Sequence, residues 1–528
     1  MSSRFKQFVS DRGGNFALFS AILAVPLILG AGVALDVANI TRTKTQLQNA
    51  LDAAVLAIAR EGKQIGDKQA LEIANSFVRN NYGLQFADLK LVREGSTVKL
   101  DASARADMAF GGLLGYDDWK VATSSTADIA YMSYEIALVL DTTGSMAGGK
   151  LAAMKDAVDN MIVSMSAQVA DKDKLKFALV PFATFVNVGP QFGPQFKANG
   201  KIKKGTGAAW LDLNAKSDAP QTELKKGVSR FELFNNLNEP WKGCVETRFP
   251  TRKAAHDVAD TAPDPKDKRS LFMPAFAIDE PDAAEFENSY VASDADPLDD
   301  SLANQLLLLA KYGLKLDASA IGPDAVTDEA GTWTPPPAEI NSGRGPNRGC
   351  DMQPVTPLTN NYGDLRTKVS QMQASGTTNI MEGVAWGERV LSPGEPFSQG
   401  AKPRASLQKV MVVLTDGSNV MGNRLTKLKS SYSSFGYLID GRLGIADGSS
   451  GDTNALMNAK TLEACTSAKQ AGTVIYTIRL EEPDVKTGTM LRDCATDPDH
   501  YFDIPSRSQL DEAFKAIKER IVLLRLAS

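Results

Sequence analysis

Histidine and cysteine are scarce in this sequence. Among 528 residues there are two histidines, His256 and His500, and four cysteines. Because the two histidines lie far apart in the chain, a zinc site rich in histidine is not expected. The simplest interpretation is that both are surface residues. The even number of cysteines is compatible with disulfide pairs.

The chain also lacks blocks of basic residues, and its net charge is only −5. A nucleic-acid-binding surface requires clustered Lys and Arg, so nucleic acid is not expected as a partner. The composition, 43% hydrophobic and 23% charged, is that of a globular protein. The length exceeds that of one ordinary domain, which predicts several units.

Charge is absent from one long N-terminal stretch. Between Arg12 and Asp36 lie 23 uncharged residues, "GGNFALFSAILAVPLILGAGVAL". A helix of this length rises about 34 Å, enough to cross a hydrocarbon core of about 30 Å. We predict a transmembrane helix over residues 15–36 after a cytoplasmic tail of residues 1–14. The alternative is a cleaved signal peptide. Against it, the apolar run is not followed by a short polar stretch with an A-x-A cleavage site, and the helical pattern continues instead.

Basic residues on the two sides of this stretch indicate its orientation. Arg4, Lys6 and Arg12 precede it, and Arg42 and Lys44 follow it. The asymmetry is small, but it favours a single span with the tail inside and the body outside. The cysteines then face an oxidising compartment, in which disulfides persist.

Residues 37–132 are predicted to form a pilin-like helix packed on a small antiparallel sheet. The membrane helix is expected to continue to about Arg60, because apolar residues recur at helical spacing at Leu47, Ala50, Leu51, Ala54, Val55 and Ile58. A second helix is expected near 67–81. The alternating segment "TVKLDASARADM" is typical of a half-buried strand, with "LKLV" as its hairpin partner. The alternative is that this segment is only a stalk that holds the next domain away from the membrane.

From residue 133 to 528, apolar strands alternate with amphipathic helices. Strands are predicted at 134–140, 176–188, 409–417 and 474–480, and the last helix at about 508–525. Strands that are apolar throughout are typical of a mostly parallel sheet covered by helices on both faces, so we predict a doubly wound α/β fold. The Pro-, Asp- and Gly-rich stretch at about 190–352 is interpreted as a long insertion, and 418–452 as a smaller one.

Acidic and hydroxyl residues gather where these strands end. They are Asp141, Thr143 and Ser145 after one strand, Thr377 and Thr378 in a later turn, and Asp416 at the end of another strand. Ligands of open parallel sheets bind outside the carboxyl ends of the strands, and hard oxygen donors suit Mg²⁺, Mn²⁺ or Ca²⁺. We therefore predict a divalent-cation site, first of all for Mg²⁺, that keeps one position open for an acid from a partner protein.

These residues resemble the metal-ion-dependent adhesion site of the von Willebrand factor A domain, which has the pattern D-x-S-x-S, then Thr, then Asp. The resemblance rests on "DTTGS", the threonine before "NIMEG", and "LTDG". It implies the fold of that domain and the metal ligands Asp141, Thr143, Ser145, Thr378 and Asp416, with Thr143 in place of a serine. Thr378 is preferred to Thr377 because it directly precedes the N-x-x-x-G turn.

The N-terminus resembles the TadE/TadG-type proteins of Flp (tight-adherence, Tad) pilus assembly. The resemblance rests on "DRGGNFALFSAILAVPLILGAGVALDVA" and the helix that continues from it. The segments "WKGCVETR", "NRGC" and "GVAWGERVLSP" and the C-terminal cysteine pair fit the TadG-like branch. This implies a single-pass protein of the bacterial inner membrane with a periplasmic A domain. The implied function is metal-dependent binding of a pilus-assembly or envelope protein, not enzymatic activity.

Four cysteines allow three pairings. Cys465 lies on a predicted helix and Cys494 follows the next strand, so these two can meet. Cys244 and Cys350 would join the ends of the large insertion. We predict this pairing.

Several other interpretations compete with these predictions. "LVLDTTGSM" is close to the D-T-G-S loop of aspartic proteases, but the added threonine and the α/β rhythm argue against such an enzyme. Asp141 alone could simply cap the next helix. The acidic loop 293–300 lacks the glycine and glutamate of an EF-hand. For the whole chain, the alternatives are a structural, envelope-spanning anchor of the assembly machinery and a secreted surface adhesin.

Overall fold

The computed structural model describes two compact units, Met1–Tyr131 and Met132–Ser528. Within residues 15–523, the description omits 62–65, 83–85, 95–96, 129–132, 170, 225–226, 281–287, 292–295, 297, 300, 302–303, 305–306, 309, 314–337, 342, 405 and 425–426. The predicted cytoplasmic tail, residues 1–14, and most of the acidic loop 293–300 therefore lie outside the described residues.

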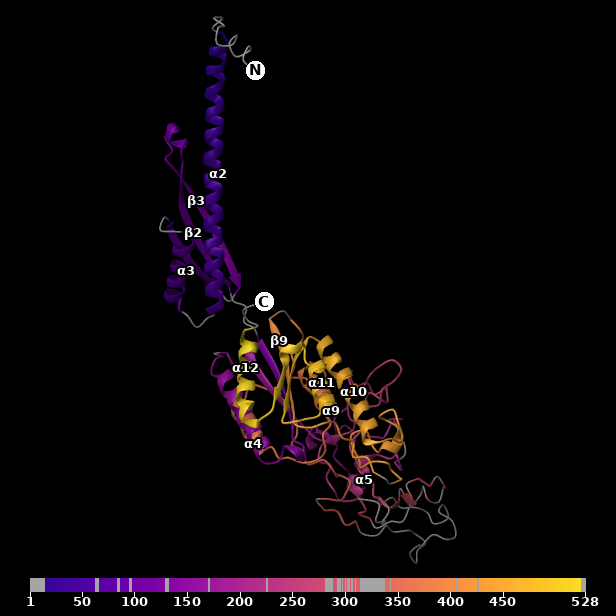
Figure 1. Cartoon of the computed structure of the whole chain (residues 1–528). Coiled ribbons are helices and arrows are strands. Elements are labelled where there is room, and N and C mark those ends of the chain that lie inside the picture. Colours follow the sequence, from indigo (N-terminus) through magenta and orange to yellow (C-terminus); the bar gives the residue numbers. More distant parts are fainter. Residues whose placement is uncertain are drawn as a thin grey trace, which may run out of the picture. The chain divides into compact units, whose positions relative to one another are not determined.

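The first unit is built on one long helix and a small antiparallel sheet (Figure 1). Its elements are α2 (Asn15–Glu61), α3 (Asp67–Tyr82), β1 (Phe86–Glu94), β2 (Thr97–Asp107) and β3 (Asp118–Asp128). The face of α2 that carries Leu47, Leu51 and Val55 packs on α3 and on the inward side chains of β2, as the helical spacing predicts. The hairpin of β1 and β2 forms as expected, whereas β3 was not predicted.

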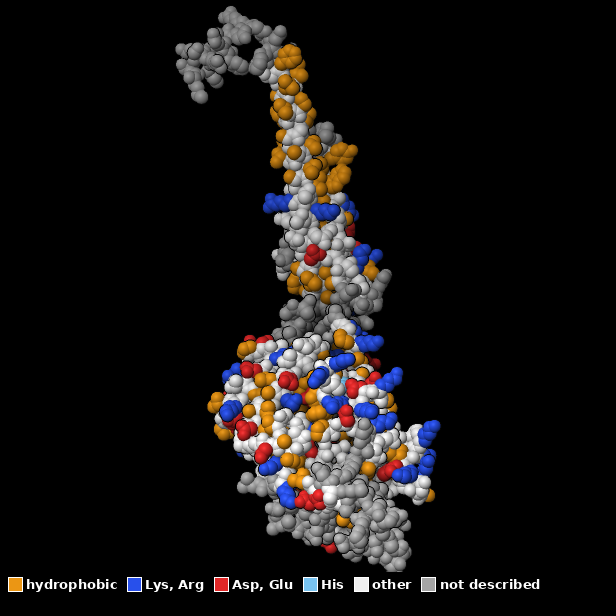
Figure 2. All heavy atoms as spheres, turned by 90° about the vertical axis from the view of Figure 1, so that its right-hand side faces the viewer, with side chains coloured by type: hydrophobic (Ala, Val, Ile, Leu, Met, Phe, Trp, Pro, Cys, Tyr) orange, Lys and Arg blue, Asp and Glu red, His pale blue; other side chains and the backbone are white. Residues whose placement is uncertain are grey.

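The N-terminal half of α2 is apolar and exposed. Its described side chains include Phe19, Leu23, Leu27 and Ile28, each more than half exposed, and Figure 2 shows them as a hydrophobic surface along the helix. The helix is long and apolar enough to cross a membrane, with a mean hydropathy of 2.2 in its most apolar window. Pro26 lies within it without ending it, which is common in membrane helices.

Asp36 is the one acidic residue in the first half of α2, and it is 3% exposed. Its carboxylate accepts backbone hydrogen bonds from Ala109 at 2.7 Å, Phe110 at 3.1 Å and Gly111 at 2.7 Å. These amides belong to the turn between β2 and β3, so one buried charge attaches the end of the hairpin to the helix. The ring of Phe110 lies directly against Gly32, where a Cβ atom would come within 2.4 Å of it.

The second unit contains a central sheet whose strand order, within the described residues, is β11-β10-β9-β4-β5-β6-β7. The first five of these strands are parallel, while β6 and β7 are antiparallel and β8 pairs with β5 in antiparallel fashion. The strands are β4 (Ser133–Asp141), β5 (Leu175–Phe182), β6 (Val186–Asn187), β7 (Cys244–Val245), β8 (Thr356–Thr359), β9 (Leu407–Thr415), β10 (Thr473–Leu480) and β11 (Tyr501–Ile504).

Helices cover both faces of this sheet (Figure 1). They are α4 (Gly149–Ser166), α8 (Tyr362–Gln371) and α12 (Leu510–Leu523) on one face, and α9 (Ile380–Leu391), α10 (Ser450–Gln470) and α11 (Val485–Cys494) on the other. Ile136 and Leu138 of β4 point to the first group, and Ala137 and Val139 to the second. The predicted doubly wound α/β fold is thereby confirmed.

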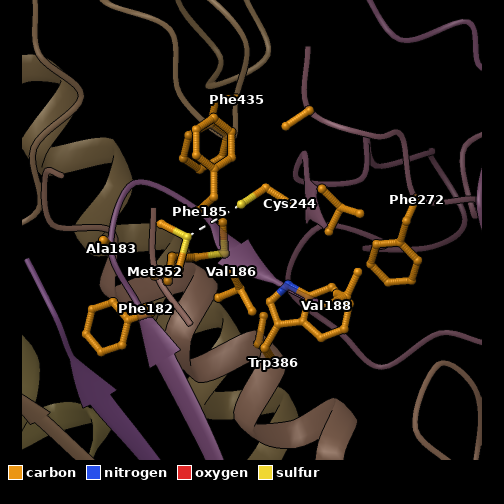
Figure 3. Packing of buried hydrophobic residues seen from close by; sticks show 14 of the residues in the cluster. Phe182, Ala183, Phe185, Val186, Val188, Cys244, Phe272, Met352, Trp386 and Phe435 are labelled. Carbon is orange, nitrogen blue, oxygen red and sulfur yellow. Dashed lines mark hydrogen bonds between the residues drawn. The ribbon is translucent and has the colours of Figure 1, made fainter. Parts of the chain in front are cut away.

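Helix α9 lies unusually close to the sheet. Cβ atoms added to Gly383 and Gly387 would come within 2.9 Å and 2.7 Å of the Val139 side chain, so only glycine permits this approach. Between these glycines and the insertion, Trp386 is completely buried. Figure 3 shows it beside Val186, Val188 and Phe272. The contact of Gly383 and Gly387 with Val139, close to the end of β4, brings the N-terminal part of α9 to that end of the strand.

The long insertion is irregular in backbone but not loose in packing. It contributes a short helix, α5 (Arg230–Asn236), and buried aromatic residues such as Trp210, Phe272 and Tyr290 to the core on the α9 side of the sheet. The structure contains the disulfides Cys244–Cys350 and Cys465–Cys494, which is the predicted pairing.

The expectation that both histidines lie at the surface is wrong for His256, whereas His500 is partly exposed. The His256 side chain is 4% exposed, with Nε2 2.8 Å from Asp267 and Nδ1 2.7 Å from Thr261. His500 pairs with Asp497 at 2.6 Å through Nδ1, and its ring lies 4.4 Å from that of Tyr476. The pairing partners of His256 lie five and eleven residues away along an irregular loop, where no periodic pattern indicates burial.

We expect Asp36→Ala to loosen the end of the β2–β3 hairpin, because three buried backbone amides lose their acceptor. Each lost acceptor of this kind costs about 1–3 kcal/mol. In the full chain held in detergent, hydrogen exchange of residues 109–111 should speed up roughly tenfold or more. Asp117→Ala, at an exposed carboxylate near the same turn, is the control. Unchanged exchange in Asp36→Ala would show that this carboxylate does not hold the hairpin.

A second prediction concerns Glu388 of α9. Burial raises its pKa from 4.5 to about 7, and nearby Asp260 adds to the shift. One carboxylate oxygen accepts from Ser467 Oγ at 3.1 Å, and no described group donates to the other.

Because the folded pKa of Glu388 exceeds the unfolded one, its contribution to stability is complete below about pH 4.5 and is lost as the pH rises through about 7. Between pH 5 and pH 8, the wild type should lose roughly 2–3 kcal/mol more unfolding free energy than Glu388→Gln. Urea unfolding at the two pH values measures this difference. Glu463→Gln, at an exposed position of α10, should behave like the wild type.

Candidate metal centre

The predicted site lies at the point where the strand order reverses, because strands are added on one side of β4 and then on the other. From β4 the chain continues to β5 on one side, and β9 occupies the other side. The pairing of Leu140 with Leu414 brings the carboxyl ends of β4 and β9 to the same level. Asp141 ends β4, Thr415 ends β9 and Asp416 follows directly. Crevices of this kind are where open α/β sheets bind ligands.

A chain of hydrogen bonds joins the two carboxylates. Asp141 Oδ1 accepts from Thr143 Oγ1 at 2.6 Å, Thr143 Oγ1 lies 3.0 Å from Ser145 Oγ, and Ser145 Oγ donates to Asp416 Oδ1 at 2.6 Å. The other oxygen of Asp141 accepts from Thr415 Oγ1 at 2.6 Å. Asp141, Thr143 and Asp416 are each no more than 3% exposed, whereas Ser145 is exposed. The cluster is therefore rigidly held and opens to solvent at Ser145.

The turn before α9 completes the cluster and distinguishes between its two threonines. Its backbone is bonded to the first loop, because Gly144 N donates to Gly376 O at 3.0 Å and Ser375 N donates to Thr142 O at 2.8 Å. Thr377 points away from the carboxylates, with its hydroxyl 3.1 Å from that of Thr184.

Thr378 and Ser145 both lie beside Gly417. A Cβ atom added there would be 3.2 Å from Thr378 Oγ1 and 3.7 Å from Ser145 Oγ. The structure thus brings together Asp141, Thr143, Ser145, Thr378 and Asp416, the five residues carried over from the resemblance, and leaves Thr377 outside the group.

Lys150 is a member of the cluster that the sequence analysis missed. It lies in the first turn of α4, and its Nζ is 2.6 Å from Asp416 Oδ2. A cation at the N-terminus of a helix is disfavoured by the helix dipole. A lysine in this unfavourable position could have been recognised in the sequence, because it indicates a nearby negative group that compensates for the helix dipole. The side chain of Lys150 is 18% exposed and that of Asp416 is fully buried.

The electrostatics of the cluster favour an added positive charge. Burial raises the pKa of Asp141 from 3.8 to about 6, and the neighbouring carboxylate of Asp416 contributes to the shift. Hydrogen bonds from Thr143 and Thr415 act in the opposite direction. Among the described residues, Lys150 is the ammonium group in contact with this pair of carboxylates, through Asp416. When both carboxylates are ionised, the cluster carries a net negative charge, which a divalent cation would neutralise.

The donor set fits a hard cation. It consists of carboxylate and hydroxyl oxygens, the ligand type of Mg²⁺, Mn²⁺ and Ca²⁺. Among the described residues there is no group of three or more His, Cys, Asp or Glu side chains suited to a metal, so softer transition-metal sites are not indicated there. The helix-cap alternative for Asp141 is wrong, because the N-cap of α4 is Gly148 and Asp141 instead accepts from the backbone amide of Thr143 at 2.8 Å.

Residues 14–61 match the family model of Flp pilus-assembly TadE/G-like proteins (Tad). The resemblance of the N-terminus to TadE/TadG-type proteins is therefore confirmed for this segment. The match and the apolar helix together fit a single-pass membrane protein. No curated protein matches the sequence.

Among solved structures, the chain is similar to the pilus adhesin SpaC from Lactobacillus rhamnosus GG, with 10% identity, a TM-score of 0.32, and coverage of 83% of this chain and 36% of SpaC. It is also similar to the vWF domain of the type V pili tip protein Mfa5 from Porphyromonas gingivalis, with 9% identity, a TM-score of 0.32, and coverage of 74% and 95%. This chain thus spans about a third of the length of SpaC. The fold assignment rests on the strand order, not on these scores.

Proposed function

We propose that the second unit binds one divalent cation at the candidate metal centre and uses it to capture an acidic group of a protein partner in pilus assembly. The observation that carries this proposal is the hydrogen-bonded chain from Asp141 through Thr143 and Ser145 to Asp416, which is exposed to solvent at Ser145. Asp141, Thr143, Ser145, Thr378 and Asp416 would hold the cation directly or through water. Mg²⁺ is the first candidate because such a site has few carboxylates and keeps waters, with Mn²⁺ and Ca²⁺ as alternatives.

The charges of the site explain why the partner would be acidic. Asp141 and Asp416 together carry two negative charges when ionised, and Lys150 offsets one of them. Without a cation the site is net negative and repels a carboxylate. With a divalent cation it becomes net positive, so a carboxylate from another protein can take the open position. The cation would thereby supply Lewis acidity and reverse the sign of the local charge.

The proposed location is the bacterial inner membrane, with α2 as a single-pass anchor and the bulk of the chain in the periplasm. The family match and the apolar, exposed first half of α2 support the anchor. The disulfides support an oxidising compartment. The partner would be a component of the pilus-assembly machinery or of the envelope. The role is binding rather than catalysis, because the clustered oxygens serve as ligands.

The geometry of the two threonines gives a matched test of cation binding. We expect the full chain in detergent to bind one Mg²⁺, with Thr378→Ala weakening the affinity by about tenfold or more and Asp141→Ala abolishing binding. Thr377→Ala should leave the affinity within about twofold, because its hydroxyl contacts Thr184 and not the cluster. Isothermal titration calorimetry measures all four proteins. Equal effects of the two threonine variants, or no heat with Mg²⁺, Mn²⁺ or Ca²⁺, would contradict the proposed ligand set.

Partner capture requires a separate experiment. The full chain, immobilised in nanodiscs, should retain specific proteins from a solubilised envelope extract in Mg²⁺ but not in EDTA, and Asp141→Ala should retain none of them. The thermal unfolding of each protein in both buffers serves as the control for folding. Retention of the same proteins in EDTA would instead support a structural role in which the cation only stabilises the domain.

A further inference from the structure

The long insertion contains a buried lysine beside two buried carboxylates. Lys311 Nζ lies 3.0 Å from Glu223 Oε2 and 3.4 Å from Asp279 Oδ2, and all three side chains are completely inaccessible to solvent. It also donates to the backbone carbonyl of Asp279 at 2.6 Å. None of these residues belongs to the candidate metal centre.

The surroundings of this triad are apolar and aromatic. Phe276, Tyr290, Val291 and Tyr312 belong to the buried core around it, and the rings of Phe276 and Tyr312 are in edge contact at 5.3 Å. Such an environment disfavours charged groups and favours the neutral amine and neutral acid. Burial raises the pKa of Glu223 to about 7, although Lys311 opposes the shift. Glu223 can therefore gain or lose a proton near neutral pH.

Asp279 is oriented like an acyl group prepared for attack. Its Oδ1 accepts two backbone hydrogen bonds of 2.7 Å, from Tyr290 and Val291, which resembles an oxyanion hole. Its Oδ2 faces Lys311 and accepts no hydrogen bond from any described group. The arrangement polarises the carboxyl carbon and leaves one oxygen available to depart.

Glu223 is held in a strained conformation in contact with Lys311, and Asp279 is near enough to influence the pKa of its carboxyl group. Its φ of 65° lies in the left-handed region, which is uncommon for a residue with a side chain. Its Oε1 accepts from the hydroxyl of Tyr312, and its Oε2 contacts Lys311. Backbone strain of this kind persists only where the surroundings fix the residue, and it gathers at sites with a chemical role.

We propose that Lys311 and Asp279 condense to an intramolecular amide, with Glu223 as the proton carrier. Lys311 Nζ attacks Asp279 Cγ, the N–C bond forms, and the Cγ–Oδ2 bond breaks. Glu223 accepts a proton from Nζ and delivers it to Oδ2, which leaves as water. The net reaction of one amine and one carboxylic acid gives one amide and one water, so no oxidant or other co-reactant is needed.

The amide would close the chain between residues 279 and 311 within the irregular insertion. Unlike the disulfide Cys244–Cys350, which also ties this insertion, it would survive reduction. The cross-link would keep the insertion folded on the domain in either redox state.

The test is the mass of the intact full chain, denatured and fully reduced. We expect the wild type to be lighter than its sequence by one water molecule, and we expect a protease digest to yield one peptide pair joined through Lys311 and Asp279. Lys311→Arg and Glu223→Gln should each show the full sequence mass. Lys242→Arg, which alters an exposed Lys–Asp pair at 3.2 Å, should keep the deficit.

A wild type at its full sequence mass would overturn the proposal and leave a buried ion pair. A deficit that persists in Lys311→Arg would also overturn it, because the water would then be lost elsewhere, as in succinimide formation at an Asp-Gly sequence. The first result does not depend on the folding of any variant, because it is measured on the wild type alone. Neither result bears on cation binding.

Discussion

The parallel pairing of β4 with β9 is the constraint on which the candidate site depends. It places the ends of two strands, separated by more than 260 residues, side by side, so that Thr415 reaches Asp141 and Ser145 reaches Asp416. A shift of register by one residue would turn these side chains to the opposite face of the sheet. Because both strands are buried on both faces, the hydrophobic core fixes that register.

The position of Thr378, the remaining candidate ligand, depends on α9, whose approach to the sheet is set by two glycines. Gly383 and Gly387 let the helix lie against Val139, and the packing of Trp386 with Phe272, at 4.9 Å between ring centres, holds it there. The insertions cover this helix. They are joined to each other by buried charges, since Glu246 of the first contacts Arg230 at 2.7 Å and Arg442 of the second at 2.6 Å.

Each charged group in this network has an oppositely charged partner, so its burial does not leave an unpaired charge. Burial alone would raise the pKa of Glu246, but its two arginine partners bring it below the ordinary value. A buried ion pair is expensive when one partner is missing and tolerable when the geometry is complete. The insertions are thus part of the domain core. The two clusters differ in solvent access, because the hydroxyl–carboxylate cluster opens at Ser145 whereas the Lys311 triad is completely buried.

The sequence by itself determined the apolar N-terminal helix, the doubly wound fold, the cysteine pairing and the residues around Asp141 and Asp416. The helix and the fold follow from local periodicity, and the residues around Asp141 and Asp416 follow from the rule that ligands gather at the carboxyl ends of parallel strands. The cysteine pairing was chosen among three possibilities from where the cysteines lie relative to the predicted elements and the long insertion. Only the tertiary structure decided that Thr377 contacts Thr184, that Lys150 pairs with Asp416, that His256 is buried, and that the irregular insertion forms a dense core. The physical reason is that spacing along the chain specifies which face of an element is buried. Which residues contact that face depends on segments that are distant in sequence and come together only when the whole chain folds.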